Sequence, residues 1–364
     1  MRHSIFYLCI ALGLTFPAQA INIQISYTFD TNNFFDPGTT NGTEARSALS
    51  AAAARFSEVI TSSLDAVPAG STSAGLNDWR ISFSHPETGN SFEVSTASDS
   101  FADDIVDAGW APANLYDPSL GLAADTWLLY AGGRSLSVAA EGGTGTGTNF
   151  SAVFEDSSSH LRRSWRSGSF DSTDLPVWGG AIGFDSDGST NWHFNNETIP
   201  DAGEVDFYSI ALHEVGHALG LSGGWDEYMD LINSSDAFTG ANALAALDSD
   251  NGTTGSTGID VHGGTNRHFK DNTYDSLPFE NGSIPAVGTD GKTLQDLLLE
   301  PVANFSSTHR RFELTNVDVG ALQDIGWEII PEPSSTSLLV VSLSLVILRR
   351  RQRLKSEPAL LEKR

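Results

Sequence analysis

The sequence predicts one mixed α/β domain over residues 21–330, because segments with strand and helix periodicity follow one another along the chain. From Ile21 to Phe29 apolar and polar residues alternate, which is typical of a half-buried strand. From Glu44 to Leu64 apolar residues recur at nearly helical spacing. An apolar fraction of 40% is enough for a sizeable core, so a wholly disordered chain is excluded.

The next elements are predicted in chain order. The glycine-rich residues 142–147 are expected to form a flexible loop, and they lack the lysine that a phosphate-binding loop requires. Glycine, serine and aspartate dominate residues 223–290, which indicates long loops. Strands are expected at Trp79–Phe83 and Thr126–Tyr130, and a short hairpin at Val177–Phe184 and Trp192–Phe194 across residues 185–188.

Two helices carry clear end signals. The first runs from Asp206, a plausible N-cap, to Leu219, and Gly220 ends it. The second begins at the sequence Thr315-Asn316-Val317-Asp318, which resembles a capping box, and Gly326 ends it. Both helices are therefore expected with defined boundaries.

The charge of the chain is large and unevenly distributed. Its 364 residues include 20 Lys and Arg against 46 Asp and Glu, a formal net charge of −26. This charge excludes a general nucleic-acid binder, which needs a basic face for phosphate groups. Residues 21–330 hold 12 basic and 43 acidic residues, a net charge of −31, while seven of the other eight basic residues lie in the last 16 positions. An acidic body is therefore followed by a basic end.

The first 20 residues have the organisation of a secretory signal peptide. A charged start at Arg2 is followed by an apolar run and by Ala18-Gln19-Ala20, a small-residue cleavage site. The alternative is an N-terminal core strand. The chain has one cysteine, Cys9, and it lies in this segment. A mature protein without cysteine must build any metal site from His, Asp or Glu.

The C-terminal end has three parts in order. Pro331-Glu332-Pro333 precedes an apolar stretch, Ser334 to Leu348, and a basic cluster from Arg349 to Arg353. Fifteen residues are shorter than the roughly 20 of a comfortable membrane span. Residues 331–353 resemble the PEP-CTERM sorting signal of Gram-negative bacteria, followed by a basic and polar cytoplasmic tail at residues 354–364. The alternative is a plain C-terminal anchor.

The sorting-signal resemblance implies a partner and a destination. An exosortase-type enzyme would process the tail while it is transiently anchored in the inner membrane. The protein would then move to the cell surface or the extracellular matrix. Either interpretation of the tail implies that residues 21–330 are exported.

The predicted helix at 206–219 contains the sequence His213-Glu214-Val215-Gly216-His217. Histidines at positions i and i+4 leave the same face of a helix, so both imidazoles can bind one Zn²⁺. Glu214 can accept a proton from a water molecule that attacks a carbonyl group, and can then pass it to the leaving amine. The spacing therefore predicts zinc at His213 and His217, with Glu214 as the catalytic residue.

The third ligand is not given by the usual spacing. The extended HExxHxxGxxH pattern of the metzincins has its third histidine where this chain has Gly223. The chain instead resembles leishmanolysin and its bacterial relatives, which have an insertion before that histidine. The segment Gly263-Gly264-Thr265-Asn266-Arg267-His268-Phe269 is similar to theirs and implies His268, 51 residues after His217, as the ligand. His262 and then His309 are the alternatives.

The resemblance extends over about residues 177–327. Leu298-Leu299-Glu300-Pro301 matches the Met-turn of the family, with Leu299 in place of the methionine. Residues 314–327 are similar to its terminal helix. The resemblance thus implies a metzincin or zincin-like catalytic domain with a twisted mixed sheet, an active-site helix and a C-terminal helix.

Three functions fit these patterns. The first is an exported zinc endopeptidase that acts on polypeptides, and the second is a non-catalytic surface or matrix protein that keeps the fold. The third is a zinc hydrolase with a downstream glutamate, such as Glu227, as third ligand. Asp-rich residues 185–188 and 248–252 could bind Ca²⁺, but both lack the full twelve-residue pattern, and ordinary turns are expected.

Overall fold

The chain divides into two compact units, of which the first ends at Ile329. The computed structural model describes residues 21–64, 80–95, 122–148, 178–223, 225–262, 267–270, 286–287, 294–295, 297–300 and 311–330. All of these residues except Ile330 belong to the first unit. The predicted signal peptide and sorting tail lie outside these residues. In the described part of the chain, no helix is long and apolar enough to cross a membrane.

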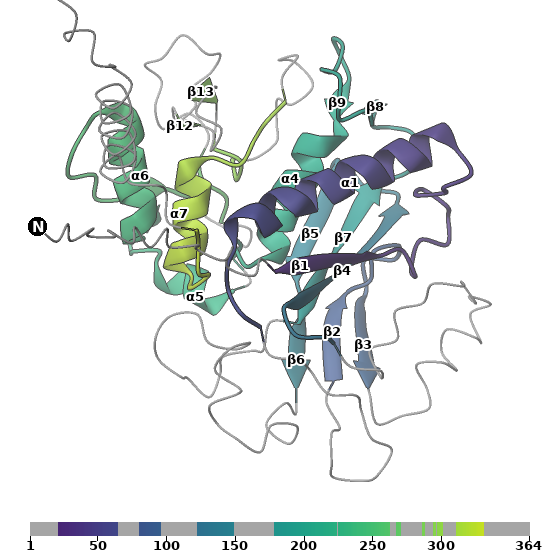
Figure 1. The fold of residues 1–364 in the computed structure, drawn as a ribbon, viewed down its shortest axis with the longest axis horizontal. Helices are drawn as coiled ribbons and strands as arrows, with labels where there is room; N and C mark the ends of the chain where they lie inside the picture. The colour runs from purple at the N-terminus through teal and green to yellow at the C-terminus, as the bar shows by residue number, and fades with distance from the viewer. Residues whose placement is uncertain are drawn as a thin grey trace, which may run out of the picture. The chain divides into compact units, whose positions relative to one another are not determined.

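The centre of the first unit is a mixed four-stranded sheet with the strand order β1-β4-β7-β5 (Figure 1). The first three strands are parallel, and β5 pairs antiparallel with β7. In this sheet β5 is therefore an edge strand that runs antiparallel to its neighbour β7. The four strands are β1 (Asn22–Ser26), β4 (Thr126–Arg134), β7 (Gly179–Asp185) and β5 (Ala140–Thr144).

Alternate side chains of β4 point to different faces of this sheet. Trp127 and Leu129 are buried in the main core together with the residues of two helices. Tyr130, which points to the other face, instead stacks on Phe83 at a ring-centroid distance of 4.7 Å. Phe83 belongs to a small antiparallel sheet of β3 (Ser91–Ser95), β2 (Arg80–Ser84) and β6 (Thr146–Thr148). Both faces of the central sheet are thus covered.

The helix face of the sheet carries α1 (Thr40–Val59) and α4 (Phe207–Ala218), which also pack on each other (Figure 1). Thr39 caps α1 by accepting a hydrogen bond from the backbone N–H of Gly42. Four small residues allow α1 to approach its neighbours closely, and two larger ones fill the core between them. These buried residues are Ala45, Ala48, Ala52, Ala53, Leu49 and Phe56.

The prediction of long loops over residues 223–290 is wrong in part. This region contains α5 (Asp226–Asp230), α6 (Ala241–Asn251) and the paired strands β10 (Ala237–Phe238) and β11 (Ile259–Asp260). Helix α6 packs on α7 (Asn316–Asp324), as Figure 1 shows. Asp324 of α7 accepts hydrogen bonds from the backbone N–H groups of Asn242 and Ala243. A carboxylate from a distant helix thus replaces the local N-cap that the sequence lacks.

Two strand predictions are also corrected. The glycine-rich residues 142–147 do not form a flexible loop, because they lie mainly in β5 and β6. The expected hairpin is absent from the described residues, since β7 pairs with β4 and β5 and not with β8 (Trp192–His193). Strand β8 pairs in parallel with β9 (Val205–Asp206). Residues 286–287 and 294–295 form the last pair, β12 and β13.

The two Asp-rich segments differ: residues 185–188 turn the chain at the end of β7, whereas residues 248–251 are the last residues of α6, so the expectation of an ordinary turn is wrong for most of the second segment. Asp185 accepts hydrogen bonds from the backbone N–H groups of Leu136 and Thr190 and from the Ser189 hydroxyl, so it turns the chain after β7. Asp248 accepts from the backbone N–H groups of Gly255 and Ser256 after α6. Both carboxylates thus hold local backbone.

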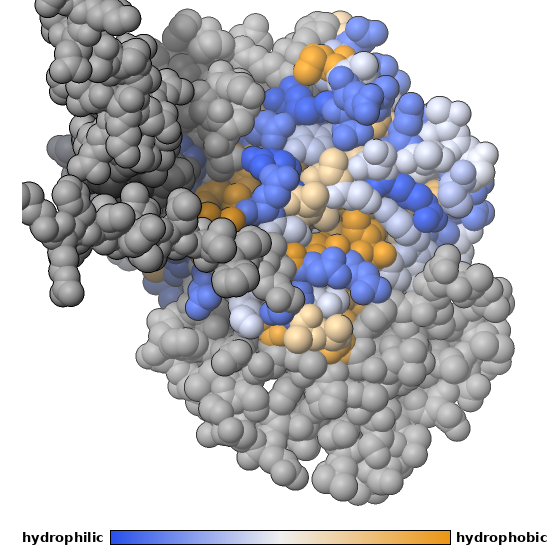
Figure 2. Space-filling model, in the orientation of Figure 1, coloured by the Kyte–Doolittle hydropathy of each residue, from blue (hydrophilic) through white to orange (hydrophobic). Residues whose placement is uncertain are grey.

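Polar residues and small apolar patches alternate over the described part of the face shown in Figure 2. The large apolar side chains that the described residues expose are Val138, Ile199 and Ile330. Most large apolar side chains of these residues are therefore used in the core. The buried polar side chains of the described residues include His213, Glu214 and His217 of α4.

Candidate metal centre

Helix α4 carries the central part of the candidate site and is buried along its whole length. Asp206 caps it by accepting from the backbone N–H of Ser209, as predicted from the sequence. Arg311 donates to both carboxylate oxygens of Asp206, at 3.0 and 2.7 Å. The start of the helix is thus fixed by a buried charge pair, which holds the rest of the helix in one position.

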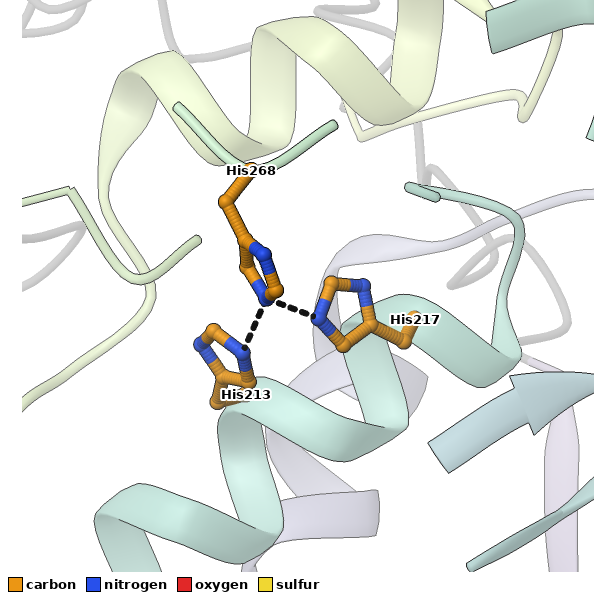
Figure 3. A group of neighbouring side chains, drawn as sticks. All are labelled: His213, His217 and His268. Carbon is orange, nitrogen blue, oxygen red and sulfur yellow. Dashed lines mark hydrogen bonds between the residues drawn. The ribbon is translucent and has the colours of Figure 1, made fainter. Parts of the chain in front are cut away.

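Three histidine side chains meet at one point above this helix (Figure 3). His213 and His217 come from successive turns of α4, and His268 approaches from the opposite side. The Nε2 atom of His268 lies 3.2 Å from Nε2 of His213 and 2.9 Å from Nε2 of His217. The three residues predicted as ligands are therefore brought together by the fold.

Backbone carbonyl groups hold two of these rings in one orientation. Nδ1 of His213 lies 2.5 Å from the carbonyl oxygen of Leu298, and Nδ1 of His217 lies 2.7 Å from that of Leu221. A carbonyl oxygen can only accept, so each Nδ1 carries the proton. In the neutral ring Nε2 then has a free lone pair, which is directed at the other histidines.

The electrostatics of the site keep the rings neutral. Burial lowers the pKa of His217 to about 4 and that of His268 to about 3. Burial and the two neighbouring rings lower the pKa of His213 well below 6.5. At neutral pH the three imidazoles are therefore uncharged, which is the form that binds a metal ion.

The donor set fits a metal ion. One proton on Nε2 of His268 can point at only one of the other two Nε2 atoms, so lone pairs face each other at the second contact. A cation between the three nitrogens satisfies all of them. Zinc–nitrogen bonds of 2.0–2.1 Å in tetrahedral geometry separate ligand atoms by about 3.3 Å, close to the 3.2 and 2.9 Å observed.

The alternative ligands do not join this group. Among the described residues, His213, His217 and His268 are the set of three whose ligand atoms lie within 4.8 Å of one another. His262 follows the bridge residue Val261, and its backbone N–H donates to the carbonyl oxygen of His268. Glu227 is in α5 and also lies outside the group, and His309 is outside the described residues.

Glu214 lies between the two histidines of α4 and is only 5% exposed. Burial raises the pKa of its carboxyl group to about 8. A hydrogen bond from the backbone N–H of Gly142 in β5 opposes this shift. A Cβ atom at Gly142 would lie 2.6 Å from the backbone oxygen and 2.8 Å from Oε2 of Glu214, so glycine is required for the edge strand to reach the helix.

Leu299 lies against the same helix. A Cβ atom at Gly216, between the two histidines of α4, would be 3.4 Å from a methyl group of Leu299. The neighbouring carbonyl groups of Leu298 and Leu299 accept hydrogen bonds from His213 and from the backbone N–H of Phe269. The segment Leu297–Glu300 therefore supports both sides of the histidine cluster.

Sequence reasoning missed several supports of the site. Thr144 of β5 donates to the carbonyl oxygen of His217, and Tyr228 of α5 donates to that of Arg267. Arg267 has a φ of 48°, an unfavourable backbone conformation for a residue other than glycine, immediately before His268. These contacts join residues far apart in the sequence, and no local pattern indicates them.

No family model matches the chain, and no curated protein matches it. The function of this site must therefore be inferred from its own residues.

Proposed function

We propose that the chain is an exported zinc-dependent endopeptidase with a metzincin-like domain. The observation that carries this proposal is that three neutral histidines converge at one point, and that two of them share helix α4 with a buried glutamate. His213, His217 and His268 would hold the zinc ion. Three imidazoles with a further open position are the ligand set of several catalytic zinc sites, whereas structural sites are closed by four protein ligands.

Each residue of the site has a chemical task in this proposal. A bound zinc ion supplies Lewis acidity, which polarises a substrate carbonyl group and makes water more acidic. Glu214 accepts the proton of the attacking water and passes it to the leaving amine. Burial raises the pKa of Glu214 to about 8 in the metal-free protein, and the charge of a bound zinc ion would oppose this shift by favouring the ionised carboxylate, which is the form that accepts a proton. The carbonyl groups of Leu298 and Leu221 keep the histidine lone pairs directed at the metal.

The position of the edge strand β5 favours a polypeptide as the substrate. It is the last strand of the central sheet among the described residues, and it contacts Glu214 directly at Gly142. Gly143 has open space around the position of a side chain. An extended peptide can add to such an edge through main-chain hydrogen bonds, which places its carbonyl groups beside the histidines.

Export remains part of the proposal. Residues 1–20 supply the signal peptide and residues 331–353 the sorting signal, which an exosortase-type enzyme would process at the inner membrane. The net charge of −31 over residues 21–330 keeps such a domain soluble through self-repulsion. The destination is the cell surface or extracellular matrix of a Gram-negative bacterium.

The decisive experiment measures bound zinc and the cleavage of an unfolded protein substrate. We expect Glu214→Gln to keep the zinc and lose cleavage by a factor of at least about 100. Glu197→Gln, at an exposed turn, is the matched control and should cleave normally. Equal cleavage by the wild type and Glu214→Gln contradicts the mechanism. Bound zinc without hydrolysis of a broad peptide library instead supports the non-catalytic alternative, which Gly223 and Leu299 suggested.

A further inference from the structure

Asp318 at the start of α7 has more hydrogen bonds than a helix cap needs. Its Oδ2 atom accepts from the backbone N–H and the hydroxyl of Thr315, which completes a capping box. The same oxygen accepts from the backbone N–H of Leu298, at 3.1 Å and 20 residues away in the sequence. The bond to Leu298 has no role in capping and therefore needs another explanation.

The backbone of Leu298 connects Asp318 to the histidine cluster. Its N–H is bound by Asp318, and its carbonyl oxygen accepts from Nδ1 of His213 at 2.5 Å. The next carbonyl, of Leu299, accepts from the backbone N–H of Phe269, beside His268. One carboxylate thus holds the segment on which two of the three histidines depend.

A carboxylate at this position is energetically costly. Asp318 is completely buried, and burial raises its pKa to about 6. Among the described residues, no cationic side chain forms an ion pair with it. Capping would be served equally well by an exposed residue, since helix N-termini accept many polar groups. The cost therefore points to a role beyond the helix.

We infer that Asp318 is a positioning residue of the metal centre: it fixes the Leu298 peptide, which orients the His213 ring toward the metal. Partners of this kind hold the ligand ring and its tautomer, and their loss lowers metal affinity by roughly 10–100-fold. The inference rests on metal binding by the three histidines, which is one part of the proposed function. It does not rest on peptide hydrolysis.

The test compares zinc affinity in the full chain, by competition with a chromogenic chelator, for three variants. Asp318→Ala removes the bond to Leu298, and we expect it to weaken zinc binding by roughly 10–100-fold. Thr315→Ala, the matched control, weakens the same cap but leaves that bond, so its affinity should stay within about twofold of wild type. Asp318→Asn keeps an oxygen acceptor and should restore most of the affinity.

A second measurement separates positioning from folding. Co²⁺ in place of zinc reports the geometry of its ligands by its visible spectrum, and we expect the spectrum to change in Asp318→Ala and not in Thr315→Ala. If Asp318→Ala does not fold, Asp318→Ser, whose hydroxyl is too short to reach Leu298, takes its place with the same expectation.

Equal affinities in the alanine or serine variant and the Thr315 control overturn the inference. So does an Asp318→Asn variant that binds as weakly as the alanine variant. A wild type that binds zinc but cleaves nothing contradicts the proposed function and leaves this inference intact. A wild type that binds no zinc overturns both.

Discussion

Replacing Glu214 by glutamine should change how the stability of the metal-free protein depends on pH. Burial raises the folded-state pKa of Glu214 to about 8, from 4.5 in an exposed chain. The folded state therefore holds this proton more tightly than the unfolded state. The associated stability is fully present below pH 4.5 and is lost as the pH rises through 8.

The size of the effect follows from the shift. A difference of about 3.5 pKa units corresponds to about 5 kcal/mol between the extremes of pH. Between pH 5 and pH 8.5 the linkage relation gives a loss of about 4 kcal/mol. Glutamine has nearly the same shape and can still accept from the backbone N–H of Gly142, but it does not ionise. The loss should therefore be absent from Glu214→Gln.

The assay is urea unfolding of both metal-free proteins at pH 5 and pH 8.5. At pH 5 the unfolding free energy of the variant should exceed that of the wild type by less than about 1 kcal/mol. At pH 8.5 this difference should be larger by about 4 kcal/mol. The three histidines are neutral in both folded proteins over this range and ionise alike in both unfolded states, so their contribution cancels. Saturating zinc should reduce the difference, because its charge favours the ionised carboxylate. A difference in unfolding free energy that is the same at both pH values would refute the reasoning.

Three more variants test the site. His268→Ala should lower zinc affinity by at least about 100-fold in chelator competition, whereas His262→Ala should stay within about fivefold; the reverse order would make His262 the ligand. Gly142→Ala should destabilise the protein by about 1–3 kcal/mol in urea unfolding and slow cleavage, because its Cβ would lie 2.6 Å from the Glu214 backbone oxygen; unchanged stability would contradict the close contact. Leu299→Met should change the unfolding free energy by less than about 1.5 kcal/mol and leave cleavage similar, and a gain of more than tenfold in cleavage would show that leucine limits the site.

Local signals were sufficient for some elements. The two helices with capping residues, α4 and α7, begin where Asp206 and Thr315 predicted. The alternating segment from Ile21 contains β1, although the strand ends at Ser26 and not at Phe29. In these cases the determining residues are neighbours in the sequence.

Other elements depend on distant partners. The glycines around Gly142 form a strand because their missing side chains allow close packing on Glu214. Helix α6 receives its cap from Asp324, more than 80 residues away. A sequence pattern contains no information on such contacts, so the glycines of residues 142–147 predict a flexible loop, and the glycine, serine and aspartate of residues 223–290 predict long loops.

The candidate site shows the same division. The spacing of His213 and His217 predicts one face of a helix, and the structure places them there. His268 came from a resemblance alone, since no spacing rule joins it to the helix. Asp318 was predicted only as part of a capping box, because its bond to Leu298 exists only in the folded chain.

X-ray absorption at the zinc edge of the loaded full chain tests the central claim most directly. We predict one zinc ion bound by three imidazole nitrogens at about 2.0–2.1 Å, with a light-atom ligand in the remaining position. His268→Ala should reduce the number of imidazoles to two. A spectrum without three imidazoles in the wild type, or one that His268→Ala leaves unchanged, would contradict the three-histidine site.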